Sequence, residues 1–158
     1  MVRAHAHLSR LNKDDNEEAR GLLAKAVARD PDSAWGYTGL AISHTQDALW
    51  GWSDSRVQSI MAAQQNAQRA IALDDAGAQA YALIGLVRLV SRQHEEAIGI
   101  LERAIKLNPN LANAHASLGL PLAFCSQTDA AAEQVKQVMR LSPRDPLNVF
   151  WFNVLALA

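Results

Sequence analysis

The sequence predicts an all-α fold in which antiparallel helix pairs stack into a right-handed helical-repeat solenoid. Three observations support this fold class. One set of small and apolar residues returns after 34 residues, helical periodicity covers most of the chain, and Ala and Leu dominate while β-branched residues are sparse. A fixed period of about 20–50 residues is typical of stacked supersecondary units. We expect one domain with about four units and nine helices.

The repeat is clearest in the second half of the chain. The first copy reads Tyr81-x2-Ile84-Gly85, Ala97-x3-Leu101 and Pro109; the second reads His115-x2-Leu118-Gly119, Ala131-x3-Val135 and Pro143. We expect helices over about 78–91 and 94–107, and over 112–125 and 128–141. The residue before a proline disfavours the α conformation, so each second helix should end just before its proline.

The unit over 34–77 carries an insertion. It keeps Tyr37-x2-Leu40-Ala41 and Ala63-x3-Ala67, but Pro31 and its counterpart Asp75 are 44 residues apart. The ten extra residues are placed in a loop around 48–56, between helices over about 33–48 and up to 73. Ser53 or Ser55 is expected to cap the second of these helices.

The first unit, over about 1–33, matches the repeat less clearly. We expect a helix over 2–11 and a second one that ends before Pro31. Asp15 and Glu18 have the spacing of a capping box, which would open this second helix.

Small residues recur where the two helices of a unit would cross. Gly85, Gly119 and Ala41 should allow this close approach on the first helices. The alanines of the second helices should act likewise at the crossing (Ala19, Ala63, Ala97, Ala131) or face the next unit (Ala26, Ala70, Ala104). A larger side chain at such a crossing would overpack it.

This pattern resembles the tetratricopeptide repeat, a helix–turn–helix unit of 34 residues. The resemblance divides the chain into units at about 1–33, 34–77, 78–111 and 112–145, with a half unit over 146–158. The family often has glycine in the turn within a unit, where Arg92 and Ser126 stand here.

The resemblance also implies an inner wall that contacts another protein or peptide. The family geometry places on it Trp35, Thr38, Ile42, Gln79, Ala82, Leu86, Leu89, Asn113, Ala116, Leu120 and Phe124. This set is mostly apolar and lacks the basic residues of the relatives that grip a C-terminal carboxylate. It favours a helix or an extended apolar segment as the ligand.

Two aromatic segments lie outside this wall. Trp50 and Trp52 in the insertion either cover the neighbouring helices or form a contact point for a partner, since Trp is frequent in binding hot spots. Residues 146–158, with Phe150 and Trp151, are apolar on nearly all sides, so this helix should be buried against a further half unit or in a homodimer.

Composition narrows the function classes. The formal net charge is −1, and neither half forms a basic stripe, which argues against nucleic acid as a ligand. No apolar run is long enough to predict membrane insertion or a signal peptide. Cys125 is the single cysteine, which fits the cytoplasm best.

The sequence offers no catalytic, metal or cofactor motif. His5 and His7 are two apart and would point to different sides of a helix, so they are poorly placed for one metal. Cys125 has no neighbouring base in the sequence, and His115 takes the aromatic place of the repeat. We therefore expect no enzyme and no cofactor.

The sequence therefore predicts a protein–protein interaction module. It is also similar to the C-terminal repeat regions of bacterial class III adenylate cyclases and winged-helix regulators, through its decayed first helix, its aromatic insertion and the segment 141–146. That similarity implies a sensor or assembly segment of a larger signalling protein. A purely structural oligomerisation domain, and less so an enzyme on a helical scaffold, stay open as alternatives.

Overall fold

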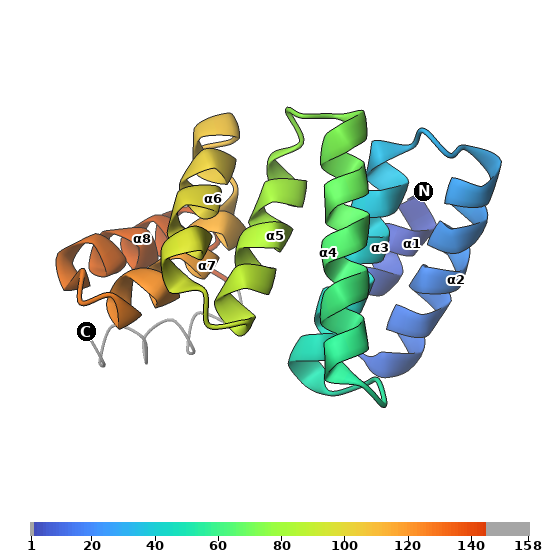
Figure 1. Cartoon of the computed structure of the whole chain (residues 1–158), viewed down its shortest axis with the longest axis horizontal. Helices are drawn as coiled ribbons and strands as arrows, with labels where there is room; N and C mark the ends of the chain where they lie inside the picture. Colours follow the sequence, from blue (N-terminus) through green and yellow to red (C-terminus); the bar gives the residue numbers. More distant parts are fainter. Residues whose placement is uncertain (1, 145–158) are drawn as a thin grey trace. The chain divides into compact units, whose positions relative to one another are not determined.

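The computed structural model describes residues 2–144, and every regular element in that range is an α-helix. Figure 1 shows the order of the helices. They are α1 (Val2–Leu8), α2 (Lys13–Arg29), α3 (Ala34–Trp50), α4 (Arg56–Leu73), α5 (Ala78–Val90), α6 (His94–Leu107), α7 (Ala112–Phe124) and α8 (Thr128–Leu141). The all-α prediction is confirmed. Eight helices occur in the described range instead of nine, because the ninth was expected over 146–158, outside the described residues.

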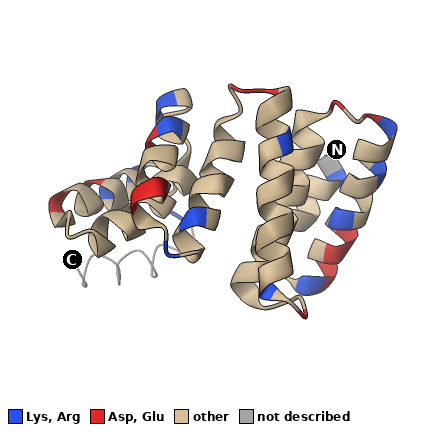
Figure 2. Cartoon of the chain, viewed as in Figure 1, with Lys and Arg blue, Asp and Glu red and all other residues tan. Residues whose placement is uncertain are grey.

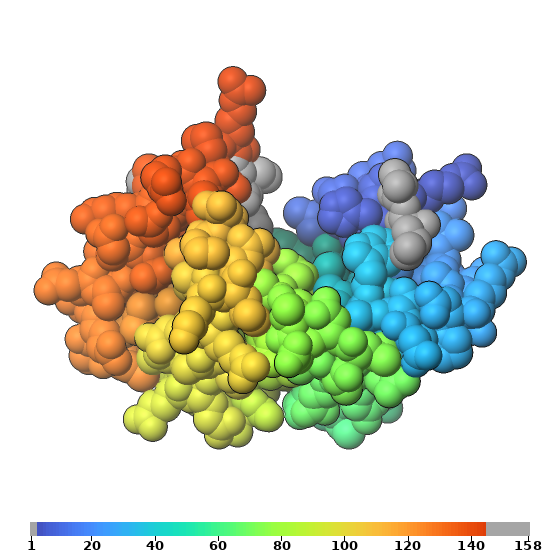
Figure 3. Space-filling view, turned by 90° about the horizontal axis from the view of Figure 1, so that it is seen from above, coloured from blue at the N-terminus to red at the C-terminus, as the bar shows by residue number. Residues whose placement is uncertain are grey.

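The helices form two compact units, one over residues 1–83 and one that begins at Ile84, within α5. In the first unit, α1 packs on α2 and α3, α2 packs on α3, and α3 packs on α4. Figure 3 shows α1 and α2, in shades of blue, at the surface of this unit. In the second unit, α7 packs between α6 and α8. The packing of neighbouring helices in pairs agrees with the predicted repeat architecture.

The helix ends follow local capping chemistry. Ser33 and Ser55 cap α3 and α4, and their hydroxyls accept from the backbone N–H of Gly36 and Gln58 at 3.3 Å each. Each hydroxyl satisfies one N–H that has no partner inside the helix. Ser55, not Ser53, is therefore the cap of α4.

The start of α2 differs from the expected capping box. Asn12 is the N-cap, and its side-chain oxygen accepts from the Asp15 N–H at 2.9 Å. The Asp15 carboxylate instead accepts from Asn12 Nδ2 at 2.6 Å and contacts His7 and Arg10. These contacts lower the pKa of Asp15 to about 2, the hydrogen bond from Asn12 contributing most. The preceding helix α1 is also shorter than expected, since it ends at Leu8.

The turns within the helix pairs keep one backbone shape with different residues. Leu11, Gly51, Arg92 and Ser126 have φ of 51°, 68°, 61° and 58°, the left-handed conformation that glycine adopts most easily. In three of these turns, the next residue donates its N–H to the carbonyl five residues earlier: Trp52 to Asp47, Gln93 to Arg88 and Gln127 to Leu122. The absence of glycine at Arg92 and Ser126 therefore does not change the turn.

Most of the ten-residue insertion lengthens α3 and α4 and does not form a loop over 48–56. Helix α3 has 17 residues against 13 in α5 and α7, and α4 has 18 against 14 in α6 and α8. The connection over 51–55 has five residues, whereas 91–93 and 125–127 have three. Four residues, close to one turn, were thus added to each helix, and two to the connection.

The predicted crossings are closely packed, but not equally. A Cβ on Gly85 would lie 2.4 Å from Leu101 Cγ, and Leu101 is fully buried. A Cβ on Gly119 would meet nothing closer than 3.7 Å. The strict size limit expected at both positions is therefore present at Gly85 alone. Most other small and apolar repeat positions are 8% exposed or less (Leu40, Ala41, Ala63, Ala97, Ala104, Ala131), whereas Ala26 is half-buried.

Candidate functional site

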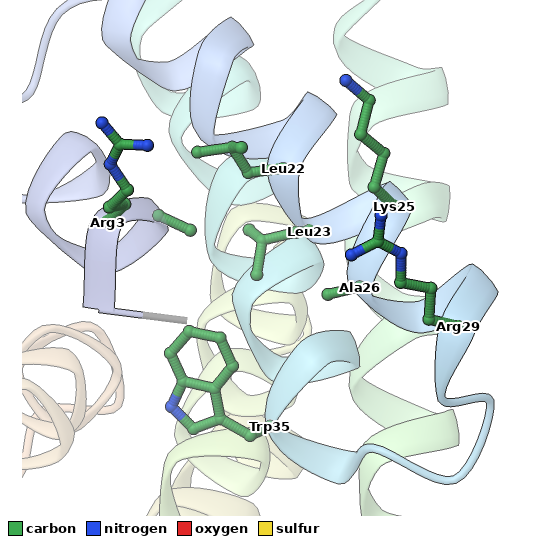
Figure 4. Close-up of a pocket in the computed structure, with 8 residues that line it drawn as sticks. Arg3, Leu22, Leu23, Lys25, Ala26, Arg29 and Trp35 are labelled. Atoms are coloured by element: carbon green, nitrogen blue, oxygen red, sulfur yellow. The ribbon is translucent and has the colours of Figure 1, made fainter.

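A pocket of about 330 Å³ opens in the N-terminal unit, where α1, α2 and α3 meet. Its apolar part consists of Ala4 from α1, three residues of α2 and Trp35 at the start of α3; the α2 residues are Leu22, Leu23 and Ala26. Its charged part consists of Arg3, Lys25 and Arg29. Figure 4 shows Arg3 on one side of the apolar residues and Lys25 and Arg29 on the other.

Secondary structure explains how this pocket is built. Leu22, Lys25, Ala26 and Arg29 recur at spacings of three and four along α2, so one face of the helix carries them. Leu23 is almost completely buried and anchors this helix in the core cluster with Ala4. Trp35 follows the Ser33 cap and keeps 40% of its surface exposed. Leu22, Leu23 and Ala26 thus form an apolar floor of the pocket, which lies between long cationic side chains.

The three cations of the pocket have no ion-pair partner among the described residues. By contrast, two acids at the start of α2 have basic partners: Asp15 pairs with His7 and Arg10, and Glu17 lies 4.0 Å from Lys13. Figure 2 shows this division along α2, with red at its N-terminal half and blue toward its C-terminal end. The pocket therefore lies in a locally positive region of a chain whose net charge is −1.

A buried polar network lies deeper between α2 and α3. Asn16 Nδ2 donates to Ser43 O at 3.1 Å and to Asp47 Oδ1 at 2.8 Å, and Arg20 forms an ion pair with Asp47. Asn16 and Asp47 are 1% and 4% exposed. Burial and the nearby Arg20 lower the pKa of His44, while Asp47 opposes this shift. These partners make the network a structural link between the two helices.

The end of the α3–α4 pair exposes a second apolar surface. Trp50 is 48% exposed, Leu49 is 45% exposed, and Val57 and Met61 at the start of α4 are more exposed still. Trp50 ends α3 instead of lying in a loop, and it stacks on the half-buried Trp52 with ring centroids 6.3 Å apart. The interpretation that both rings cover neighbouring helices is therefore wrong for Trp50.

The structure gives the expected inner-wall residues different degrees of exposure. Exposed are Trp35, Asn113 and Phe124; half-buried are Thr38, Ile42, Gln79, Leu86 and Leu120; buried are Ala82, Leu89 and Ala116. Phe124 is 66% exposed and stacks on His94 at 4.8 Å. Only Trp35 of this set lines the pocket. Phe150 and Trp151 lie outside the described residues.

The titratable residues singled out in the sequence have structural contacts. His115 is buried, with Nδ1 2.7 Å from Gln134 Oε1 and Nε2 3.0 Å from Pro109 O. His7 contacts Asp15, as described above, and Cys125 is a free, half-buried thiol. Within residues 2–144, no three His, Cys, Asp or Glu side chains come together to hold a metal. No helix in this range has the length and apolarity needed to cross a membrane.

Comparison with solved structures places the chain among helical-repeat proteins. It superposes on TTC0263, a thermophilic protein of Thermus thermophilus described as a TPR protein (TM-score 0.70, 20% identity, 87% of this chain and 72% of that one). It also superposes on YrrB, described as a TPR protein with an unusual peptide-binding site (TM-score 0.59, 22% identity, 91% and 68%). The fold is that of tetratricopeptide-repeat proteins.

Similarity in sequence alone is more limited. A stretch of 67 residues is 37% identical to the cell division cycle protein 27 homolog of Caenorhabditis elegans. This stretch is 42% of the present chain and only 8% of that protein. No protein-family model matches the chain. The expected similarity to adenylate cyclases and winged-helix regulators does not appear among these relatives.

Sequence reasoning found Trp35 but missed the rest of the pocket. The missed cations lie on α1 and α2, the unit in which the repeat pattern is weakest. One signal was present: Leu22, Lys25, Ala26 and Arg29 share a helical face on which apolar and basic residues alternate without an acidic partner. The contribution of Arg3 depends on how α1 folds back on α2, which the pattern does not specify.

Proposed function

We propose that this chain is a protein–protein interaction module that binds a segment of another polypeptide in the pocket of its N-terminal unit. The observation that carries the proposal is the pocket itself, where an exposed tryptophan stands beside a preformed apolar floor. Ligand pockets typically combine such a floor with a few polar groups, within about 300–1,000 Å³. The peptide-binding site named for YrrB supports the proposal by analogy of fold.

Peptide selection tests this function without assuming a ligand. A displayed library of random peptides is panned against the immobilised chain, and the affinities of selected peptides are measured by fluorescence anisotropy. Trp35→Ala should weaken binding at least about tenfold, because tryptophans at interfaces often contribute about 2 kcal/mol or more. If no selected peptide binds reproducibly, the proposed function is wrong.

Trp50→Ala is the matched control for Trp35→Ala. Both substitutions remove an indole ring of similar exposure, 48% and 40%, from opposite ends of α3. Peptide affinity should stay within about twofold of the wild type in Trp50→Ala. If instead Trp50→Ala abolishes binding and Trp35→Ala does not, the contact site is the end of the α3–α4 pair.

The inner wall expected from the repeat extends this proposal. Trp35, Thr38 and Ile42 are three and four residues apart on α3, so a bound segment that starts at Trp35 can continue along this helix. A selected peptide that is crosslinked at both Trp35 and Ile42 would support the extension. Crosslinks confined to Trp35 would limit the site to the pocket.

The proposal also includes the finer expectation of a cytoplasmic, regulatory or assembly segment of a bacterial signalling protein. Mass spectrometry of the endogenous polypeptide would test it directly. A cyclase or winged-helix segment in the same polypeptide supports this role, and its absence from the whole gene product contradicts it.

Homodimerisation through the C-terminal helix is the alternative proposal. It rests on the apolar composition of residues 146–158. Sedimentation equilibrium of the wild type and of the Phe150→Asp, Trp151→Ser double variant distinguishes a monomer from a homodimer. A wild type that is monomeric throughout the concentration range contradicts the dimer.

A further inference from the structure

We propose that the occupant of the pocket is an acidic peptide segment that carries one bulky apolar side chain; this inference rests on the proposed function. The apolar side chain would lie on Leu22, Ala26 and Trp35, and flanking carboxylates would lie beside Arg3, Lys25 and Arg29. The expected inner wall alone predicts an apolar ligand. The pocket adds the positive charge of three basic residues, which the expected inner wall does not have.

Charge complementarity is the first argument. Three cations line one pocket, and no carboxylate among the described residues pairs with any of them, although the same unit pairs Arg10, Lys13, Arg20 and Arg69 with acids. Asp30, the neighbour of Arg29, accepts from the Asp32 N–H in the following turn. Like charges that share a pocket repel one another, and an anionic ligand relieves this repulsion.

The geometry of the pocket is the second argument. The cations stand on two sides of the apolar residues, so one ligand can contact both kinds of group (Figure 4). A volume near 330 Å³ is at the small end of ligand pockets, which suits one large side chain instead of a folded surface. An extended peptide then places its neighbouring residues within reach of the long basic side chains.

The local character of the positive charge favours a peptide over a nucleic acid. Residues 1–77 carry eight Lys and Arg against ten Asp and Glu, so the cations do not extend into a basic stripe. Nucleic-acid sites need a stripe of cations that follows the phosphate backbone. A membrane surface would likewise contact the acidic start of α2, where carboxylates face solvent.

Three fluorescein-labelled hexapeptides test the proposal by anisotropy. The acidic peptide is Asp-Glu-Leu-Phe-Asp-Glu, its amide counterpart is Asn-Gln-Leu-Phe-Asn-Gln, and the third replaces the central Leu-Phe of the acidic peptide with Ser-Ser. At about 50 mM salt the acidic peptide should bind at least about tenfold more tightly than the amide peptide, and the difference should shrink at about 500 mM. The Ser-Ser peptide should bind as weakly as the amide peptide.

A charge-removing double variant locates the effect. Arg3→Gln with Lys25→Gln should reduce affinity for the acidic peptide about tenfold and leave the amide peptide within about twofold, since each exposed ion pair contributes up to about 1 kcal/mol. Both residues are exposed and form no ion pair with the residues that the structure describes, so the thermal unfolding midpoint should not fall. Arg29 is left unchanged because its place in the last turn also stabilises α2.

Two further variants serve as controls. Arg56→Gln with Lys106→Gln removes the same charge from exposed positions that do not line the pocket, and should change neither affinity. Arg3→Lys with Lys25→Arg keeps both charges and should stay within about threefold of the wild type.

The outcomes separate this inference from the proposed function. Equal binding of the acidic and amide peptides overturns the charge inference while the binding function stands. Tighter binding of a single-stranded oligonucleotide or of anionic vesicles than of the acidic peptide also overturns it. Failure of every panned and synthetic peptide overturns the function and the inference together.

Discussion

The long helix pair α3–α4 and the regular pair α7–α8 follow one repeat plan but differ at their far ends. In α7–α8, helices of 13 and 14 residues meet at a three-residue connection. In α3–α4, each helix gains four residues, and the added part of α3 is residues 47–50. These four residues include the buried carboxylate of Asp47 and the exposed ring of Trp50.

The difference shows how a repeat tolerates an insertion. Four residues are close to one helical turn of 3.6, so the faces of both helices keep their direction and the turn keeps its hydrogen bond. Polar contacts hold the added turn of α3 to α2. By contrast, α7 and α8 pack mainly through apolar residues. Variants can test each side of this comparison.

The largest effect is expected from Asp47→Ala. It leaves the buried Asn16 amide and the Arg20 guanidinium without their carboxylate, which should lower the free energy of unfolding by about 3 kcal/mol. Chemical denaturation measures this change. Asp54→Ala, an exposed carboxylate in the connection of the same helix pair, is the control and should stay within about 0.5 kcal/mol. Equal effects would show that Asp47 does not hold the added turn.

A second comparison concerns Gly85 and Gly119, which occupy the same place 34 residues apart. Gly85→Ala should cost about 1–3 kcal/mol, because the new Cβ collides with the buried Leu101. Gly119→Ala should instead raise stability by about 0.5–1 kcal/mol, since Ala is the better helix former and has room. Thermal unfolding of both variants checks the signs. Destabilisation of similar size at both positions would contradict the packing difference.

The turns of the two pairs offer a smaller, reciprocal test. Ser126→Gly should stabilise the chain by about 0.5–1 kcal/mol, and Gly51→Ala should destabilise it by about 1 kcal/mol, because both positions have positive φ. The double variant should come close to the wild type, as the sites belong to different helix pairs. Effects of the same sign would disprove the conformational explanation.

The smallest effect is a pH dependence confined to the long pair. The folded pKa of His44 is below its ordinary value of 6.5, so the unfolded chain binds its proton first as the pH falls. This contribution to the free energy of unfolding is therefore complete above about pH 6.5, and it is lost as the pH falls from there to the lowered pKa of the folded state. Urea denaturation between pH 7 and pH 5 should show a steeper loss in the wild type than in His44→Gln, and parallel curves would refute this assignment.

The sequence predicted the regular units well and the irregular one less well. The bounds of α5 to α8 agree with expectation within one residue, and Pro109 and Pro143 mark the ends of α6 and α8. The insertion was expected in a loop because Trp50 and Gly51 interrupt the helical pattern, and a single sequence does not show that two helices are lengthened together. The pocket cations could not be predicted, because they are distinguished by the lack of an ion-pair partner within residues 2–144, which is a property of three-dimensional packing.

The left-handed turn residues have a consequence for recognising proteins of this kind. Leucine, arginine and serine occupy three of the four bends in the described pairs, while the backbone there takes the conformation usually credited to glycine. A profile that rewards glycine at the bend would score those three units poorly. The spacing of alanines across the helix contacts is a more dependable guide to how many such modules a polypeptide contains.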